Sequence, residues 1–514
     1  MDKQNNILNT QVIIVGAGPT GLSLAAQLLR YNIKSIIIEK NEKATAFSKA
    51  LVVQARTLEI FQELGIAEKA INEGQVTTAM NFFYKGKQKA SVNIAGLGKG
   101  LSPFPYALSL EQSKTEKLLV DYLSANQKEI QWKSEFIHFE QNENGVTGYY
   151  KDSIGQVQKI EADYLVGCDG ASSQVRHQMG LLFEGDTVPK IFYVADVKLK
   201  SAVINKNELF MFMIQKGFIL FFPMEGKGHY RIVGILPNGS IAGEEIKIDD
   251  IKNYIKQQII SPVEVEEVLW FSSYKVHSRK ADSFEKGRCY IAGDAAHIHT
   301  PAGGQGMNTG IQDAYNLAWK IAYTIGGKIN PVILSTYNIE RSENAKHLLQ
   351  TTDRMFDLMA GANPYWNFLR LNFFPLIIGI VTKSTFIKKI IFPLISQTGI
   401  TYEGNYLITK SSIGKVKAGV RMPYFIFSDG KQIFEYLAEP AFKILFFGNH
   451  NKNNSWQLSD AKIKIVSYIF KEIPASLFGS EANFYILLRP DNHISYIGKD
   501  LDICKGFLDK IASR

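Results

Sequence analysis

The sequence is poor in cysteine and contains no dithiol pair. Its three cysteines are Cys168, Cys289 and Cys504. An odd number spread over 514 residues argues against a disulfide framework and predicts a reducing, cytoplasmic compartment. Because no CxxC occurs, redox chemistry by a cysteine pair is excluded as well.

Long apolar runs and compact basic clusters are also missing. The first residues, MDKQNNILNTQ, are polar and lack the apolar core of a secretory signal. Between 369 and 400, lysines interrupt the apolar runs, and none reaches the roughly 20 residues of a spanning helix. We expect buried helices here and no transmembrane segment, with attachment to a membrane surface as the alternative. The net charge of +9 is too dispersed for a nucleic-acid-binding face.

What is present is an ordinary globular composition, with 46% apolar and 21% charged residues. A chain of 514 residues exceeds one hydrophobic core, so we expect two to four domains. The chain begins with a βαβ pattern: a strand at 11–15, an alanine-rich helix at 22–29 and a strand at 35–39. Strand-like runs dominate from 183 to 276, which predicts a mostly antiparallel sheet. A strong helix at 311–325 returns to the earlier pattern.

The first chemical motif is a glycine-rich turn between the first strand and the first helix. It comprises Gly16, Ala17, Gly18, Pro19, Thr20 and Gly21. Gly16 permits the tight turn, Gly18 lets a pyrophosphate approach the backbone, and Gly21 lets the helix pack on the strand. Glu39 ends the next strand 18 residues after Gly21, where a carboxylate accepts hydrogen bonds from ribose hydroxyls. A negative group there disfavours a 2′-phosphate, so the slot fits FAD or NAD better than NADP.

Two later motifs extend the site. Asp169 and Gly170 end a strand, where backbone and carboxylate can lie beside a dinucleotide. In the segment 293–308, Asp294 suits ribityl hydroxyls, the glycines let the backbone lie against a flavin ring, and the next helix aims its positive end at the pyrimidine side. The residues expected at the cofactor in this segment are Asp294, Pro301, Gly303, Gly304, Gly306, Met307 and Asn308. His297 and His299 form an HxH pair, but no further ligand cluster lies nearby, so no metal site is expected.

Three segments carry a family resemblance: GAGPTGL at 16–22, CDGASSQVR at 168–176 and GDAAHIHTPAGGQGMNTGIQDAYNLAWK at 293–320. They resemble the group A flavoprotein monooxygenases, the family of p-hydroxybenzoate hydroxylase and phenol hydroxylase. The resemblance covers about residues 8–400, and residues 402–514 resemble the thioredoxin-like C-terminal domain of the phenol hydroxylase branch.

The resemblance implies an α/β (α+β) fold. A Rossmann-like FAD-binding domain would comprise 1–182 and 277–400, with a β-sheet substrate domain inserted at 183–276 and a thioredoxin-like domain at 401–514. Because the last domain lacks CxxC, a structural or dimer-contact role is expected for it, and a homodimer stays open.

The resemblance also implies roles for single residues. Lys40, Arg56 and Gln112 match positions near the cofactor, although a helix-surface charge is the alternative for Arg56. Lys49 stands where many members carry arginine.

The implied reaction starts with reduction of FAD by NADPH or NADH. Reduced flavin and molecular oxygen then form a C4a-hydroperoxide, which hydroxylates a small aromatic or phenolic substrate. No protein nucleophile is required and no catalytic base is identified. Tyr193, His229 and Tyr274 lie in the expected sheet, where packing or surface roles explain them better.

Two alternatives remain. An enzyme of the same architecture could perform epoxidation or Baeyer–Villiger oxidation; halogenation is disfavoured because the five tryptophans form no WxW. A non-catalytic flavoprotein scaffold is the second alternative, which the intact cofactor motifs disfavour.

Overall fold

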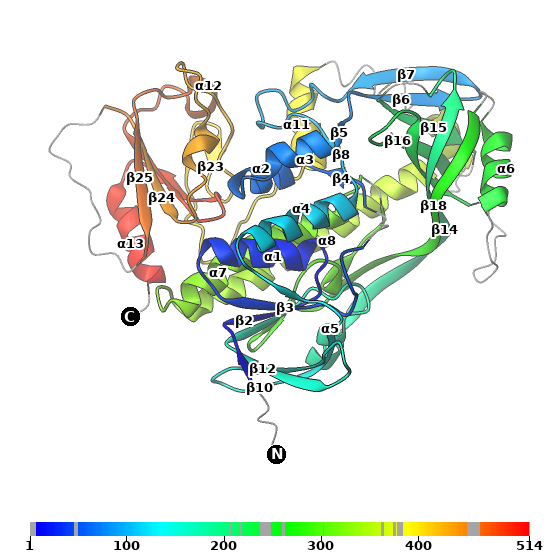
Figure 1. Cartoon of the computed structure of the whole chain (residues 1–514). Coiled ribbons are helices and arrows are strands. Elements are labelled where there is room, and N and C mark those ends of the chain that lie inside the picture. Colours follow the sequence, from blue (N-terminus) through cyan, green and yellow to red (C-terminus); the bar gives the residue numbers. More distant parts are fainter. Residues whose placement is uncertain are drawn as a thin grey trace.

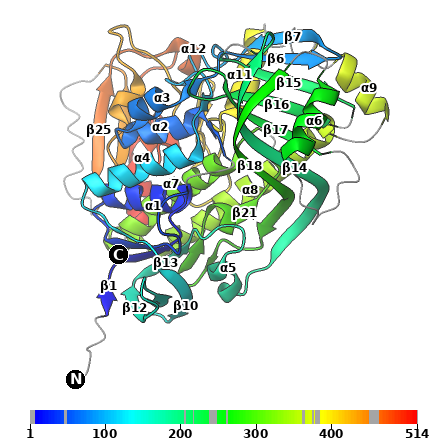
Figure 2. The same ribbon diagram turned by 45° about the vertical axis from the view of Figure 1, so that its right-hand side comes forward.

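The computed structural model describes residues 7–45, 50–204, 207–215, 217–236, 248–259, 263–301, 303–360, 364–373, 377, 384–449 and 463–512. Its centre is an α/β layer built from both halves of the chain. A large sheet lies on one side of this layer and the C-terminal segment on the other (Figure 1). The view turned by 45° shows the same three parts (Figure 2).

A six-stranded, mostly parallel sheet forms the α/β layer, in the order β19-β20-β13-β2-β3-β9. Its strands are β2 (Val12–Val15), β3 (Ser35–Ile38), β9 (Ile130–Gln131), β13 (Tyr164–Gly167), β19 (Glu285–Lys286) and β20 (Cys289–Ile291). The β2 sequence VIIV is buried at every position. A parallel strand covered on both faces is apolar throughout, which explains this continuous run.

Helices cover this sheet, and α1 (Pro19–Arg30) packs against both α4 (Gln112–Ala125) and α7 (Gly306–Ile325). A Cβ at Gly21 would lie 2.0 Å from the Gly16 oxygen, so only glycine allows α1 to approach β2 this closely. Three shorter helices lie in the same part of the chain: α2 (Ala55–Glu63), α3 (Ala67–Glu73) and α5 (Gln174–Met179). A small sheet consists of β4 (Val52–Val53), β5 (Gln75–Val76) and β8 (Leu108–Ser109). A four-stranded sheet consists of β1 (Leu8–Asn9), β10 (Glu135–Gln141), β11 (Val146–Lys151) and β12 (Val157–Ala162).

The eight-stranded sheet has the order β21-β18-β14-β17-β16-β15-β6-β7. Its strands are β6 (Ala79–Tyr84), β7 (Lys87–Asn93), β14 (Phe183–Ser201), β15 (Leu209–Ile214), β16 (Gly217–Pro223), β17 (His229–Ile235), β18 (Val263–Ala281) and β21 (His297–Ile298). The sheet thus takes in three strands from outside 183–276, and β6 joins β15 in parallel. The sequence pattern did not indicate these additions.

The two faces of this sheet have different covers. On one face, α6 (Ile248–Gln258) packs Ile251 and Ile255 against a core that includes Tyr193. On the other face, Phe192 packs against Phe356 of α8 (Ser335–Ala360). Further along the chain are α9 (Pro364–Asn372) and α11 (Thr385–Ile395). Among the described residues, no helix has both the length and the apolar character to cross a membrane.

The C-terminal segment contains a four-stranded sheet in the order β25-β24-β26-β27. Its elements are β22 (Ser412–Ile413), β23 (Val416–Lys417), β24 (Phe442–Phe447), β25 (Ile465–Phe470), α12 (Ala475–Phe478), β26 (Phe484–Leu488), β27 (Ile494–Gly498) and α13 (Leu501–Ile511). Trp319 and Tyr323 of α7 pack edge-on against Phe442 of β24. The segment therefore shares a core with α7. Its likeness to thioredoxin and the four domain bounds stay predictions.

Candidate functional site

The first glycine turn lies at the carboxyl end of β2. Gly16 has a φ of +103°, and a Cβ there would lie 2.4 Å from the Cys168 oxygen, so the first and second motifs are in contact. A Cβ at Gly18 would meet nothing within 4 Å. Within α1, the Leu22 amide donates to the Gly18 oxygen, which leaves the amides before it at the open N-terminal end. An exposed backbone at a helix N-terminus favours an anionic group such as a pyrophosphate.

Glu39 reaches this turn from the end of β3. Its Oε2 accepts a hydrogen bond from the Ala17 amide at 2.8 Å, and its Oε1 accepts one from the Asn41 amide at 2.9 Å. The carboxylate is half-buried, whereas Lys40 is exposed. Glu39 is therefore fixed beside the glycine turn.

The Asp169 carboxylate makes local contacts at the start of α5. It accepts hydrogen bonds from Ser173 Oγ at 2.5 Å and from the Gln174 amide at 2.7 Å. Burial raises the pKa of Asp169 despite these bonds. Gly170 is partly exposed beside it, with a φ of +80°. Arg176, from the same motif, donates to the Ala295 oxygen at 2.9 Å and so connects the second motif to the third.

The third motif, which we call the cofactor loop (293–308), begins against the first turn. A Cβ at Gly293 would lie 2.4 Å from Thr20 Oγ1, and one at Gly310 would lie 2.3 Å from the same atom. Asp294 is exposed although both its neighbours are buried. All three motifs therefore converge at the carboxyl edge of the parallel sheet, which is where α/β folds bind their ligands.

The other end of the cofactor loop is held by the Asn308 side chain. Asn308 is fully buried; its Oδ1 accepts from the Gln54 amide and from Thr57 Oγ1, both at 2.8 Å. Its Nδ2 donates to the Val52 oxygen at 2.8 Å and to the Gly304 oxygen at 3.0 Å. The Asn308 side chain thus shapes the loop, and a contact between Asn308 and the cofactor stays a prediction.

The loop presents backbone to solvent between these anchors. Gly303 is exposed, and Pro301, Gly304, Gly306 and Met307 are partly exposed. Gly303 and Gly304 have φ values of +83° and +61°, which favour glycine. The first amides of α7 follow directly.

Asp313 of α7 organises the start of the loop, and sequence analysis gave it no role. Its Oδ2 accepts from the Gly293 amide at 3.0 Å and from His297 Nε2 at 2.8 Å, and its Oδ1 accepts from Arg341 Nε at 2.6 Å. Burial alone would raise the pKa of Asp313, but Arg341 and His297 outweigh it and the pKa is lowered. The only signal in the sequence was a carboxylate on an alanine-rich helix. Among the described residues, no group of three or more His, Cys, Asp or Glu side chains could hold a metal ion.

The structure does not bring Arg56 to the cofactor loop. Its guanidinium is 2% exposed and donates to Glu59 Oε2 at 3.1 Å and to the Asp491 oxygen at 3.0 Å. It is therefore not a surface charge, and its role near the cofactor stays a prediction. Gln112 begins α4, where its Nε2 donates to Glu116 Oε1 at 2.9 Å. Lys49 lies outside the described residues.

The face of the eight-stranded sheet that carries Arg231 is turned toward the cofactor loop. Arg231 donates two hydrogen bonds of 2.7 Å to Asp196, and its Nη1 donates to the Ala50 oxygen at 3.1 Å. Ala50 lies two residues before Val52, whose oxygen is bound by Asn308. Tyr274 lies on the same face, in register with Phe192, and burial raises its pKa to about 12. Tyr193 points to the opposite face and is fully buried.

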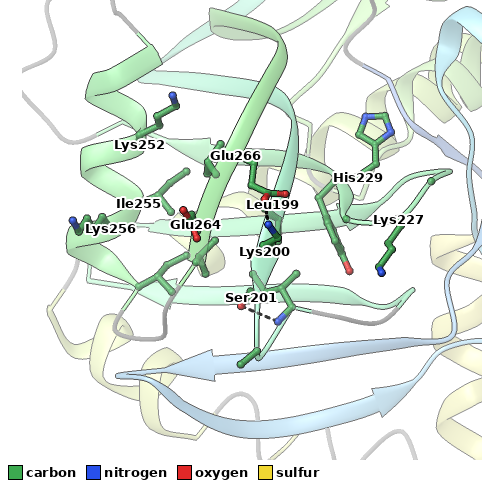
Figure 3. A pocket seen from close by; sticks show the side chains of 18 of the residues that line it. Leu199, Lys200, Ser201, Lys227, His229, Lys252, Ile255, Lys256, Glu264 and Glu266 are labelled. Atoms are coloured by element: carbon green, nitrogen blue, oxygen red, sulfur yellow. Dashed lines mark hydrogen bonds and ion pairs between the residues drawn. The ribbon is translucent and has the colours of Figure 1, made fainter.

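A cavity of about 1390 Å³ opens on that opposite face, beneath α6. Figure 3 shows Lys252 and Lys256 on α6 across from Glu264 and Glu266 of β18. His229 also lines it, at the end of β17. Because this cavity lies across the sheet from Arg231, it is not where a substrate would meet the cofactor loop.

Comparison with known proteins agrees with this geometry. The family model described as "FAD binding domain" matches residues 9–352. The chain is 33% identical over 353 residues to 6-methylpretetramide 4-monooxygenase of Streptomyces rimosus, a match covering 69% of this chain and 63% of that protein. It is 29% identical over 525 residues to an uncharacterized aromatic compound monooxygenase of Bacillus subtilis, covering 99% and 98%. The solved structure of an anhydrotetracycline hydroxylase from Streptomyces rimosus superposes with a TM-score of 0.77 at 27% identity, covering 99% of this chain and all of that one.

Proposed function

We propose that NADPH or NADH supplies the electrons for this protein and that its substrate is a phenolic ring compound. The premise is that the chain belongs to the FAD-binding domain family and is an FAD-dependent aromatic monooxygenase. The observation that carries this proposal is the convergence of three glycine-containing motifs at one sheet edge, opposite a sheet face with an aromatic and cationic lining. The relatives described above are named as a 6-methylpretetramide monooxygenase and an aromatic compound monooxygenase, which supports this substrate class.

The residues at the sheet edge fit FAD. Gly18 leaves open space for a pyrophosphate at the end of α1, and Glu39 lies beside it for a ribose. Asp294 is exposed at the start of the cofactor loop, in place to accept hydrogen bonds from ribityl hydroxyls. The exposed backbone at Gly303 and the first amides of α7 would lie along the ring.

FAD, when bound, supplies the electron transfer and the oxygen activation. The residues of the protein bind and orient the cofactor and the substrate and exclude water from the site. Tyr274 has a phenol group that is protonated at neutral pH, and burial, which raises its pKa to about 12, keeps it so in more alkaline solution; the group is therefore available as a hydrogen-bond donor to a substrate oxygen. Arg231, paired with Asp196, adds a fixed dipole on the same face. Exclusion of water by the bound substrate and the sheet face would also limit the loss of the activated oxygen as hydrogen peroxide.

The test is a screen of purified, FAD-loaded protein against monocyclic phenols and multi-ring phenols. Oxidation of NADPH and of NADH is followed by absorbance, product mass is measured, and peroxide is quantified in the same samples. We expect at least one phenol to accelerate nucleotide oxidation and to gain 16 mass units. Acceleration accompanied only by peroxide, or a lactone or epoxide product from a ketone or alkene, would refute the proposal in favour of an oxidase, Baeyer–Villiger or epoxidation activity.

Two further proposals concern the protein's setting. Cys168, Cys289 and Cys504 are all buried thiols, which supports a reducing, cytoplasmic location. A homodimer is proposed through the C-terminal segment, and the molar mass in solution measured by light scattering would decide it.

A further inference from the structure

The C-terminal segment (401–512) reaches the start of the cofactor loop through one chain of buried hydrogen bonds. Tyr402 Oη accepts from Arg341 Nη1 at 3.0 Å, and Arg341 Nε donates to Asp313 at 2.6 Å. Asp313 in turn holds the Gly293 amide and His297. Tyr402 is 5% exposed and both Asp313 and Arg341 are completely buried, so water cannot replace these bonds.

A second chain runs from the same segment to the other end of the loop. The Asp491 oxygen accepts from Arg56, and Arg421 donates to Glu59 Oε1 at 3.1 Å, so two residues of the segment hold α2. The N-terminal end of α2 holds Asn308 through the Gln54 amide and Thr57 Oγ1. Asn308 then donates to the Gly304 oxygen at 3.0 Å.

The two chains have a common anchor inside the C-terminal segment. Arg489 Nε donates to Asp491 Oδ1 at 3.0 Å, and its guanidinium carbon lies 5.0 Å from the centre of the Tyr402 ring. Arg489 also pairs with Glu340, the residue before Arg341 on α8. All these side chains are nearly or fully buried. A displacement of this anchor would therefore act on both ends of the loop together.

We propose that the described parts of the C-terminal segment, residues 401–449 and 463–512, form a clamp that positions both ends of the cofactor loop and thereby raises the affinity for FAD, with Tyr402 of this segment and Arg56 of α2 as the positioning residues. The loop contains Gly303 and Gly304, which have many conformations available when the loop is not held. Fixing both ends before binding removes part of the ordering cost that the cofactor would otherwise have to offset. This role requires no cysteine pair, in agreement with the sequence. It rests on FAD binding alone and is independent of the reductant and the substrate.

The clamp is tested by removing one hydroxyl. In Tyr402→Phe, Arg341 loses an acceptor while the ring is kept. We expect the FAD dissociation constant to rise about three- to tenfold, with a shifted flavin absorption spectrum. The matched control is Tyr406→Phe, four residues away, whose hydroxyl donates to the Lys510 oxygen at 2.8 Å within the same segment. The control should bind FAD within twofold of the wild type.

A double-mutant cycle separates positioning from general stability. If Tyr402 acts through Asp313, then Tyr402→Phe should change FAD affinity little in an Asp313→Asn background. Arg56→Lys acts at the other end of the loop, so its effect should multiply with that of Tyr402→Phe. Dissociation constants come from flavin fluorescence and, independently, from the dependence of the melting temperature on FAD concentration.

Three results would overturn the clamp. The first is wild-type FAD affinity and spectrum in folded Tyr402→Phe. The second is an equal loss of affinity in Tyr406→Phe. The third is failure of both Tyr402→Phe and Arg56→Lys to fold at any FAD concentration, because the segment would then serve folding in general and not the loop in particular.

Discussion

Replacing Asp313 with asparagine tests the charge at the base of the cofactor loop. The carboxylate accepts from three buried donors: the Gly293 amide, His297 Nε2 and Arg341 Nε. Asparagine offers one acceptor oxygen and one NH₂ donor group. The NH₂ group must therefore face at least one of the three donors without forming a hydrogen bond to it. It also leaves the Arg341 guanidinium without its counterion at a site with no solvent exposure.

Breaking a buried ion pair on one side costs about 3–5 kcal/mol. Since the whole free energy of unfolding of a domain is about 5–15 kcal/mol, Asp313→Asn should remove about a fifth of it or more. We expect a lower midpoint in urea denaturation followed by circular dichroism, both with and without FAD. Because Asp313→Asn should also weaken FAD binding, saturating FAD should stabilise the wild type more than the variant and widen the difference between the midpoints.

The control is Asp121→Asn on the surface of α4. Asp121 pairs with Lys69 at 2.9 Å and with Lys117 at 2.8 Å, but all three side chains are more than a third exposed. Surface pairs of this kind contribute about 0–1 kcal/mol. If Asp313→Asn and Asp121→Asn lowered the midpoint by the same small amount, the buried network would not hold the loop, and the reasoning would be wrong.

Three further outcomes are expected. Asp294→Ala removes an exposed carboxylate from the proposed ribityl position and should weaken FAD binding about ten- to a hundredfold, from roughly 1.5–3 kcal/mol, while the protein still folds. Equal affinity in a titration of the folded variant would remove Asp294 from the site. Gly304→Val strains a backbone φ of +61° and places a Cβ 3.1 Å from the Cβ of Val52. The loop should therefore shift, and the amount of peroxide formed per nucleotide oxidised should rise. An unchanged peroxide-to-product ratio in folded protein would mean that Gly304 only shapes the start of the helix. Burial opposes ionisation of Glu340, but Arg489 and Lys320 outweigh this effect and lower the pKa of Glu340 from 4.5 to about 2. The contribution of ionised Glu340 to stability is therefore complete above pH 4.5 and is lost as the pH falls toward 2. Denaturation midpoints across that window should fall more steeply in the wild type than in Glu340→Gln, and parallel curves would count against the ion pairs of Glu340.

Local sequence patterns were sufficient for most strands and helices of the central layer. The strands predicted at 11–15 and 35–39 are observed at Val12–Val15 and Ser35–Ile38, because each is a short apolar run between clear breaks. The helix predicted at 311–325 begins five residues earlier in the structure, at Gly306. Its start could not be predicted because two glycines precede it and no capping side chain marks it. FAD as the cofactor and the monooxygenase family are confirmed.

Long-range pairing could not be predicted in the same way. β14 and β18 are 19 residues each, far longer than their apolar parts, since each strand supplies the hydrogen-bonding partner for polar residues of the other. Strands β6 and β7 join the sheet through a parallel pairing with β15 that leaves no periodicity of its own.

The same limit explains why only some residues of the candidate site could be predicted from local spacing. Glycines have backbone roles that local spacing reveals, and Gly16, Gly21 and Gly293 all make the close approaches that glycine requires. Asp313 and Arg341 are 28 residues apart, and their pairing depends on how α7 meets α8. The Arg56 contact with Asp491 spans 435 residues. Such partners become visible only when the fold brings them together.

The pairing of β6 with β15 also determines when the large sheet can form during synthesis of the chain. Met80 pairs with Leu209, about 130 residues later in the chain, a stretch that a ribosome translates in roughly 6–26 s at 5–20 residues per second. During that time the β6–β7 hairpin has an unpaired strand edge, with Phe82 and Phe83 still uncovered, and two strands alone are marginally stable. A nascent chain halted before residue 209 therefore exposes an aggregation-prone edge, and molecular chaperones should bind it until β15 leaves the ribosome.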